Sequence, residues 1–131
     1  MAEVLKFHLV SPERKLASLD AISVTLPGIE GDLTVLPNHA TFLTSLRPGI
    51  LSVSSDAGTE EFVVTGGFAD VSESTATILA EKSIPKEEAN NDFVVSLIEE
   101  AEEELETVTE SRKASAALRL NDLKVLKELI N

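Results

Sequence analysis

Up to about Ile84, apolar and polar residues alternate along the chain with a period of two, which is typical of strands with one buried face. Gly, Pro, Asp and Ser interrupt this alternation every several residues, where turns are expected. The spacing predicts a β-sandwich or barrel of about ten short antiparallel strands, without the long helices that a parallel sheet needs. The clearest strand signals are Leu5–Leu9, Ile22–Leu26, Leu33–Leu36, Ile50–Ser54, Glu61–Thr65, Phe68–Ser72 and Thr75–Ala80.

After Pro85 the apolar residues recur every four positions, which predicts a helix. Pro85 suits the first helical position, and Glu87 and Glu88 complement the positive end of the helix dipole. We therefore expect the helix to begin at Pro85 and to bury one apolar face. That face consists of Ala89, Phe93, Leu97, Ala101 and Leu105, with Val94 and Ile98 beside them.

A second helix is predicted from near Ser111. The break is placed at Thr107–Ser111 because hydroxyl and β-branched residues, which are poor helix formers, gather there. The chain is thus expected to comprise a β-sandwich domain at residues 1–84 and an antiparallel two-helix hairpin at residues 85–131. The inner face of the second helix is expected to use Ala116, Leu120, Leu123 and Ile130.

The charge pattern supports two helices rather than one. From Lys86 to Glu110 there are ten acidic residues and one basic residue, whereas residues 111–131 contain five basic and two acidic residues. Oppositely charged helices can pair as a hairpin, although an exposed ion pair contributes only about 0.2–1 kcal/mol. The acidic run Glu99–Glu106 is also explained as a solvated helix face. A hairpin with such narrow apolar faces is marginal alone, so it is expected to pack on the sandwich or on a partner.

Composition excludes several classes of function. The net charge of −12 argues against sequence-independent binding to nucleic acid and against direct adsorption to an anionic membrane. The absence of cysteine excludes disulfides and thiolate chemistry. No apolar run approaches the roughly 20 residues that span a bilayer. The amino terminus lacks the features of a secretory signal, so the expected compartment is the cytoplasm.

The densest turn chemistry lies in Pro27–Ala40, which holds two prolines, two glycines, two acids and one of the two histidines. Such a segment fixes its backbone tightly, as in loops that present a binding surface. His39 beside Glu30 and Asp32 is a candidate metal site, but the spacing matches no zinc or calcium signature, and a turn role for His39 is favoured. We therefore predict no catalytic residue, no cofactor and no metal site.

A pair of glycines, Gly66 and Gly67, interrupts an otherwise strong strand signal. Glycines in that position indicate a bulge, a bend or a close backbone approach. A phosphate-binding loop is the less favoured interpretation because the spacing fits no nucleotide motif.

Several residue blocks stand in order along the chain: Phe7-His8-Leu9-Val10-Ser11-Pro12, Pro27-Gly28-x-Glu30-Gly31-x-Leu33-Thr34-Val35-Leu36-Pro37-x-His39-Ala40, Leu46-Arg47-Pro48-Gly49, Phe62-Val63-Val64-x-Gly66-Gly67-Phe68-Ala69-Asp70-Val71 and Thr77-Ile78-Leu79-Ala80-Glu81. Together they resemble the epsilon subunit of bacterial F-type ATP synthases, which is called delta in mitochondria. The resemblance implies a β-sandwich followed by a helical hairpin. It also implies a non-catalytic subunit of the rotating central stalk, which binds the gamma subunit and the ring of c subunits and couples rotation to ATP synthesis.

The resemblance implies which residues meet the c-ring. In the family, loops at the lower end of the sandwich face the polar loops of the ring, and here these loops are Gly28–Asp32 and Asn38–Ala40. The expected contacts are Glu30, Asp32, Asn38 and His39, with the acids opposite basic side chains of the ring.

The helical region departs from the family at one motif. Some bacterial members bind ATP through a Leu/Ile-Asp-x-x-Arg-Ala motif, and the matching positions here are Ala89, Asn90, Phe93 and Val94. The Asp and the Arg are missing, so no ATP binding is expected through this motif.

Some members of the family also inhibit ATP hydrolysis by extending their helices, which then contact the alpha and beta subunits of the enzyme. Basic side chains make such contacts, and the candidates are Arg112, Lys113, Arg119, Lys124 and Lys127. The acidic first helix would be repelled, so weak or absent inhibition is expected.

The implied location is the cytoplasmic face of the bacterial inner membrane, where the subunit would be held through its protein partners. The alternative from another class is a β-sandwich adaptor of an unrelated complex. An enzyme ranks third, because no residue pattern supports catalysis.

Overall fold

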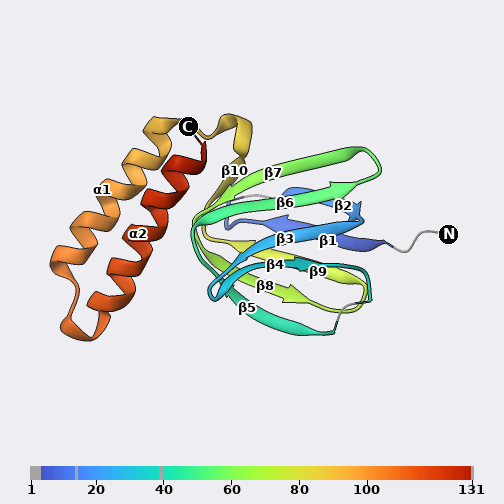
Figure 1. The fold of residues 1–131 in the computed structure, drawn as a ribbon, viewed down its shortest axis with the longest axis horizontal. Helices are drawn as coiled ribbons and strands as arrows, with labels where there is room; N and C mark the ends of the chain where they lie inside the picture. Colours follow the sequence, from blue (N-terminus) through green and yellow to red (C-terminus); the bar gives the residue numbers. More distant parts are fainter. Residues whose placement is uncertain (1–3, 14, 39, 131) are drawn as a thin grey trace.

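The computed structural model describes residues 4–13, 15–38 and 40–130, in which ten strands precede two helices (Figure 1). Two short 3-10 turns, Lys86–Glu88 and Glu110–Arg112, precede the helices. The strands are β1 (Leu5–Val10), β2 (Lys15–Ala21), β3 (Ser23–Gly28), β4 (Gly31–Val35), β5 (Phe42–Leu46), β6 (Gly49–Ser55), β7 (Gly58–Val64), β8 (Gly67–Val71), β9 (Thr75–Ala80) and β10 (Ser83–Pro85); the helices are α1 (Asn91–Thr107) and α2 (Lys113–Ile130).

The strands form one hydrogen-bonded path in the order β10-β7-β6-β3-β5-β8-β9-β1-β2, with β4 on the other edge of β3. The path folds into two layers, because β3 pairs with β6 through Ser23–Thr25 and reaches β5 only at Gly28, opposite Leu46. Buried side chains from β1 through β9 fill the space between the layers. The largest of these, all fully buried, are Phe7, Leu5, Leu9, Leu26, Leu51 and Ile78.

The predicted β-sandwich with a helical hairpin is confirmed. Thr75–Ala80 coincides with β9, and the other predicted strands overlap the observed ones within a few residues. The structure adds one feature to the antiparallel scheme, since β1 runs parallel to β9 with Leu9 opposite Ile78. Three strands were not among the clearest signals. They are β2, β5 and β10, which are either short or rich in polar and small residues.

The prediction that the first helix begins at Pro85 is wrong. Pro85 ends β10, opposite Phe62 of β7, and the 3-10 turn that follows contains Glu87 and Glu88. Helix α1 begins at Asn91, because the side chain of Asn90 accepts a hydrogen bond of 2.9 Å from the backbone N–H of Phe93. Asparagine is among the best residues at this capping position, and it sets the start of the helix more strongly than the proline does.

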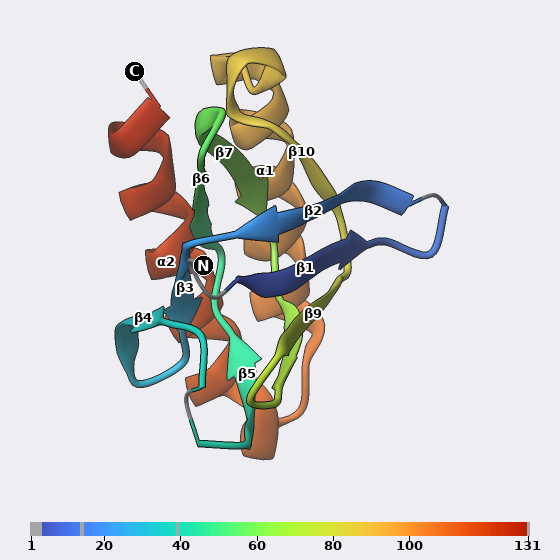
Figure 2. The ribbon, with the colours of Figure 1, turned by 90° about the vertical axis from the view of Figure 1, so that its right-hand side faces the viewer.

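The helical hairpin packs against the outer side of the layer that contains β6, β7 and β10 (Figures 1 and 2). The contact forms a second hydrophobic core, separate from the main core between the two layers. Val63 of β7 is fully buried in this second core, together with Leu123 and Leu126 of α2. Partly buried side chains surround them, among them Ile50 of β6 and Ile84 of β10. Because an isolated hairpin of this size is marginal in water, this contact with the sandwich stabilises it.

Gly66 and Gly67 both have positive φ angles, of 141° and 134°. A Cβ atom on Gly67 would overlap the carbonyl oxygen of Leu79 on the neighbouring strand and approach the Cα of Ala80 to 2.9 Å. The predicted close backbone approach is therefore confirmed at the point where β7 passes into β8.

We expect Gly67→Ala to lower the free energy of unfolding by more than the roughly 1–3 kcal/mol of backbone strain alone, because the new methyl group also collides with β9. Gly58→Ala is the matched control, since Gly58 has a φ of 123° but no atom lies within 4 Å of a Cβ built there. Chemical denaturation of both variants measures the difference. Equal losses in the two variants would show that the collision contributes nothing.

Candidate binding surfaces

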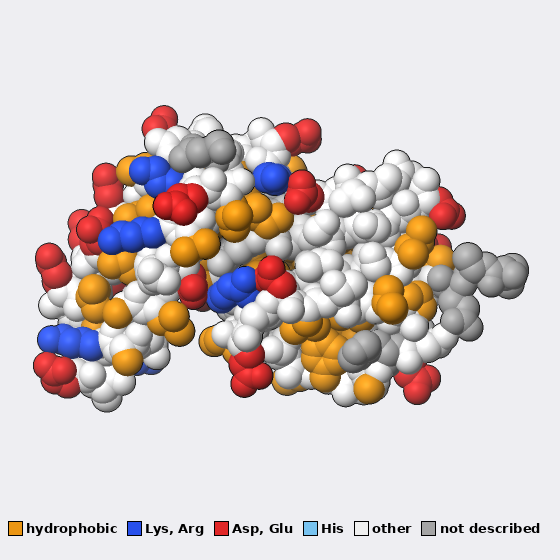
Figure 3. Space-filling view, viewed as in Figure 1, with side chains coloured by type: hydrophobic (Ala, Val, Ile, Leu, Met, Phe, Trp, Pro, Cys, Tyr) orange, Lys and Arg blue, Asp and Glu red, His pale blue; other side chains and the backbone are white. Residues whose placement is uncertain are grey.

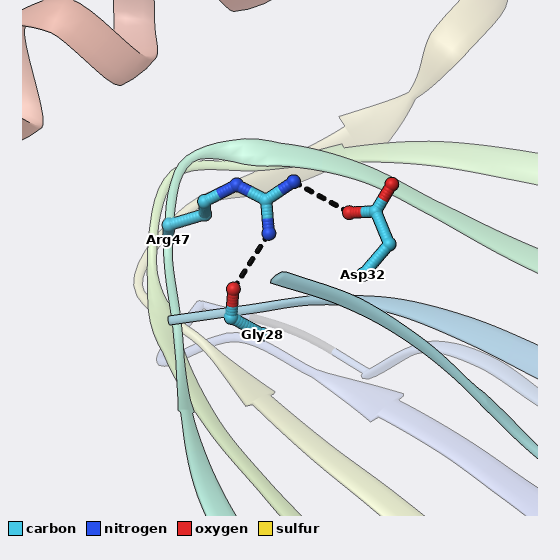
Figure 4. Close-up of polar contacts among 3 residues, drawn as sticks. All are labelled: Gly28, Asp32 and Arg47. Atoms are coloured by element: carbon cyan, nitrogen blue, oxygen red, sulfur yellow. Dashed lines mark hydrogen bonds and ion pairs between the residues drawn. The ribbon is translucent and has the colours of Figure 1, made fainter. Parts of the chain in front are cut away.

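Arg47 holds the corner at which β5 passes into β6. Its guanidinium donates a hydrogen bond of 2.6 Å to the carbonyl oxygen of Gly28 and forms an ion pair of 2.5 Å with Asp32 (Figure 4). Its backbone N–H donates to the carbonyl oxygen of Pro27 at 3.0 Å. One side chain thus ties the turn between β3 and β4 to the link between the two layers. Charge-assisted hydrogen bonds of this kind are stronger than neutral ones.

The segment Pro27–Ala40 does not present a single loop face. Strand β4 runs through its middle, so that the turn at Gly28–Gly31 lies at one end of the sandwich. Asn38 lies at the other end, where its backbone N–H donates a hydrogen bond to the carbonyl oxygen of Glu73 in the turn between β8 and β9. The expectation that the two loops share one end is therefore wrong for the turn at Gly28–Gly31 and for Asn38. A five-residue strand separates them by about 17 Å.

The four expected contact residues consequently fall into different environments. Glu30 is exposed at the tip of the turn between β3 and β4, beside Ile29, whose exposed fraction is 54%. Asp32 is held by Arg47 and so contributes to the fold of the turn. Asn38 is exposed and has a positive φ of 67°. His39 lies outside the described residues.

The positions that match the ATP motif have structural roles. Asn90 caps α1 with its side chain, and Ala89 and Phe93 pack against the second core. Val94 is fully buried. Among the residues that the structure describes, no group of three or more His, Asp or Glu side chains is arranged to hold a metal ion.

Three of the five basic candidates, Arg112, Lys113 and Arg119, lie in two different environments. Arg119 lies against the sandwich, where its guanidinium donates a hydrogen bond of 2.7 Å to the carbonyl oxygen of Thr65 and lies 3.4 Å from the carboxylate of Glu81. Arg112 and Lys113 lie at the tip between the helices, and Lys113 pairs with Glu110 at 3.2 Å. The folded hairpin therefore uses Arg119 internally and leaves the tip exposed.

A small cavity of about 80 Å³ separates α2 from the Arg47 corner, and Asp122 of α2 lines it together with Asp32. Burial raises the pKa of the Asp122 carboxyl above its usual 3.8, and the positive charge of Arg47 partly opposes this shift. Because the folded protein holds the proton more tightly, this group favours the folded state below pH 3.8. That contribution is lost as the pH rises through the raised pKa.

The layer that contains β5, β8 and β9 carries exposed apolar side chains on its outer face. Phe68 of β8 lies directly opposite Leu79 of β9, and their exposed fractions are 55% and 50%. Leu43 of β5 is 70% exposed and lies diagonally across from Phe68. We call Leu43, Phe68 and Leu79 the apolar face. The exposed Asp70 of β8 lies on the same face directly opposite Leu43, so a carboxylate borders these apolar side chains. Large apolar side chains that are exposed together mark an interaction site more often than scattered ones do.

Sequence reasoning did not find the apolar face or the role of Arg47. The signal for the face was present, because Phe68 and Leu79 are large apolar residues at the outward positions of alternating strands. Only the strand register shows that they are neighbours.

In Figure 3, hydrophobic side chains gather along the hairpin and over the lower part of the sandwich near β4 and β5, with charged side chains between them. Such a surface suits docking. Among the described residues, no helix is long and apolar enough to cross a membrane.

A β-sandwich that carries a packed carboxy-terminal helical hairpin defines the structural class of the chain. The family model described as "ATP synthase, Delta/Epsilon chain, beta-sandwich domain" matches residues 4–86. The chain belongs to this family of ATP synthase delta/epsilon chains. The resemblance seen in the sequence blocks is thereby confirmed.

Relatives match along almost the whole chain. The chain is 47% identical to the ATP synthase epsilon chain of Rhodobacter capsulatus over 131 residues, covering 100% of this chain and 99% of that protein. It is 46% identical to the epsilon chain of Ruegeria sp. (strain TM1040) over 131 residues, covering 96% of each.

Solved structures share the fold. A chain of the Euglena gracilis mitochondrial ATP synthase, in a structure of "OSCP/F1/c-ring", superposes with a TM-score of 0.75 at 24% identity, covering 100% of this chain and 83% of that one. A chain from the "central stalk/cring" of the Tetrahymena thermophila enzyme superposes with a TM-score of 0.67 at 16% identity, covering 97% and 96%.

We expect Arg119→Ala to loosen the hairpin from the sandwich, because the variant leaves the carbonyl group of Thr65 and the carboxylate of Glu81 without this partner. Hydrogen exchange of the α1 and α2 amides should quicken by about fivefold or more, given roughly 1 kcal/mol or more for a charged hydrogen bond. Exchange in β1 and β9 should stay unchanged.

Lys124→Ala is the matched control, since Lys124 is an exposed basic residue of α2 for which the described residues offer no ion-pair partner. Unchanged exchange in Arg119→Ala would mean that the apolar contact alone holds the hairpin.

Proposed function

We propose that this chain is a non-catalytic rotor subunit of the central stalk of a proton-translocating ATP synthase. In this role it binds the gamma subunit, lies against the ring of c subunits, and helps to couple rotation of the ring to ATP synthesis. The observation that carries the proposal is the apolar face on a member of the delta/epsilon family. The solved chain from Tetrahymena thermophila belongs to a central stalk and c-ring assembly, which is consistent with this role.

The apolar face is the proposed docking site for gamma. Leu43, Phe68 and Leu79 lie on the layer that the helical hairpin leaves uncovered. Burial of a large apolar side chain is worth about 1.5–3 kcal/mol, and a few such residues carry most of the binding energy of a typical interface. Asn38 lies in the loop that leads into β5, and we assign it to the border of this gamma surface rather than to the c-ring.

The turn between β3 and β4 is the proposed contact with the c-ring. Glu30 is exposed at its tip, and the described residues offer it no ion-pair partner. An exposed carboxylate on a rigid turn suits recognition of a basic side chain, where charge complementarity sets register and partner choice. Asp32 supports this contact indirectly, since its pairing with Arg47 fixes the turn.

The two parts of the chain have different roles in this proposal. Residues 1–84 provide the docking surfaces, and residues 85–131 form a hairpin whose effect on ATP hydrolysis is weak. Arg119 is engaged with the sandwich, and α1 carries the acidic run Glu99–Glu106, which disfavours an approach to acidic surfaces of the alpha and beta subunits. The Asp and Arg of the ATP motif are missing, so nucleotide is not expected to control the hairpin.

The proposed location is the cytoplasmic face of the bacterial inner membrane. Attachment there would be indirect, through gamma and the c-ring. A net charge of −12 makes direct adsorption to anionic lipid unfavourable.

We expect Phe68→Asp to weaken binding to the gamma subunit of the same organism by about tenfold or more, because the variant removes roughly 1.5–3 kcal/mol of apolar burial and adds a buried charge. Titration of purified full-length chain with gamma, followed by calorimetry, measures the loss. Leu118→Asp is the matched control, since Leu118 is an exposed leucine of α2 with a similar exposed fraction of 52%. Equal affinity for Phe68→Asp and the unchanged chain would refute the assignment of the apolar face.

A further inference from the structure

The sandwich is open along one side. Strand β2 ends one layer, while β7 and β10 end the other, and the two edges lie across from each other (Figure 2). The short β10 pairs only with residues 62–64 of β7, so residues 58–61 have no strand on that side within the described part of the chain. No strand among the described residues pairs with the outer edge of β2 along its seven residues. Unpaired edges of this length offer backbone hydrogen bonds to an added strand.

A groove of about 900 Å³ runs between these two edges, and we call it the β2–β7 groove. Its apolar floor consists of Leu16, Ala17 and Leu19 of β2 together with Phe62 of β7. The three β2 residues are only partly buried, although they pack against the main core. The groove therefore exposes the side of the core that a further strand next to β2 would cover.

The rim of the groove is acidic. Glu60 lies directly opposite Val53, whose side chain is buried in the main core, so the side chain of Glu60 is on the core-facing side of β7. None of the described residues forms an ion pair or a hydrogen bond with the carboxylate of Glu60 or of Glu87, whereas the carboxylate of Glu61 pairs with Lys86 at 3.5 Å. Lys86 also lines the groove but pairs with Glu61, so the groove combines an apolar floor with two carboxylates that form no ion pair with the described residues.

We propose that the β2–β7 groove binds an extended segment of a partner protein, which adds as a strand to the free edge of β2. Apolar side chains on one face of the segment cover Leu19 and Phe62, and a Lys or Arg of the segment pairs with Glu60. Backbone pairing supplies affinity in such strand addition, and alternate side chains supply specificity. The residues that line the groove are distinct from the apolar face and from the turn at Glu30.

The test uses the full-length, isotope-labelled chain and an eight-residue peptide of alternating valine and lysine. Titration followed by NMR should give saturable shifts confined to the amides of β2 and of residues 58–62. The same peptide with glutamate in place of lysine should not bind. Two further peptides, N-methylated on alternate amides in the two possible patterns, separate backbone pairing from charge attraction, since one pattern should abolish binding.

Glu60→Gln should weaken the lysine peptide about two- to fivefold, as expected for the loss of one exposed ion pair. Glu73→Gln is the matched control, because Glu73 is an exposed acid in the turn between β8 and β9, away from the groove. The proposal is overturned if the shifts spread over the acidic surface, if they centre on the apolar face, or if both N-methylated peptides bind fully. It is also overturned if no peptide binds at millimolar concentration, in which case Glu60 serves only to prevent the exposed sheet edge from pairing with another chain.

Discussion

The contact between Arg47 and the turn of β3 and β4 is the constraint on which the rest of the structure depends. The two layers of the sandwich meet where Gly28 pairs with Leu46, and Arg47 follows directly. Its guanidinium donates a hydrogen bond to the carbonyl oxygen of Gly28 and pairs with the carboxylate of Asp32, so it ties the corner to the turn. Glycine is required at the centre of this corner, because a Cβ on Gly28 would come within 2.8 Å of the Gly31 carbonyl oxygen.

The helical hairpin takes its position from the same end of the sandwich. Asp122 of α2 shares a small cavity with Arg47, and Arg119, one helical turn earlier, reaches the carbonyl group of Thr65. Polar contacts thus flank the apolar contact of Leu123 and Leu126 with Val63. The hairpin covers one layer and leaves the other free, which is why the apolar face remains available for a partner.

Local sequence patterns predicted the parts of the fold that depend on hydrophobic periodicity and on turn-forming residues. Alternation located most strands, and the change of period located both helices. The pattern does not reveal β10, which has only three residues, and it suggests a helix start at Pro85, whereas Asn90 supplies the cap. The parallel pairing of β1 with β9 joins residues about seventy positions apart, and no local signal specifies it.

The candidate binding residues were harder to predict for the same reason. Glu30 and Asn38 are eight positions apart in the sequence, yet β4 carries them to opposite ends of the sandwich. Asp32 is an acidic residue in a turn region and so resembles a contact residue, but its carboxylate pairs with Arg47, which follows the end of β5. Phe68 and Leu79 become a surface only through the register of β8 and β9.

The proposed docking of the chain through the outer face of β5, β8 and β9 in an assembled synthase can be tested by hydrogen exchange of this chain, free and within the purified complex from the same organism. We expect slower exchange in the complex for amides of residues 42–46, 67–71 and 75–80 and for the turn at residues 29–31. Unchanged exchange on those strands, with protection on the hairpin instead, would contradict it.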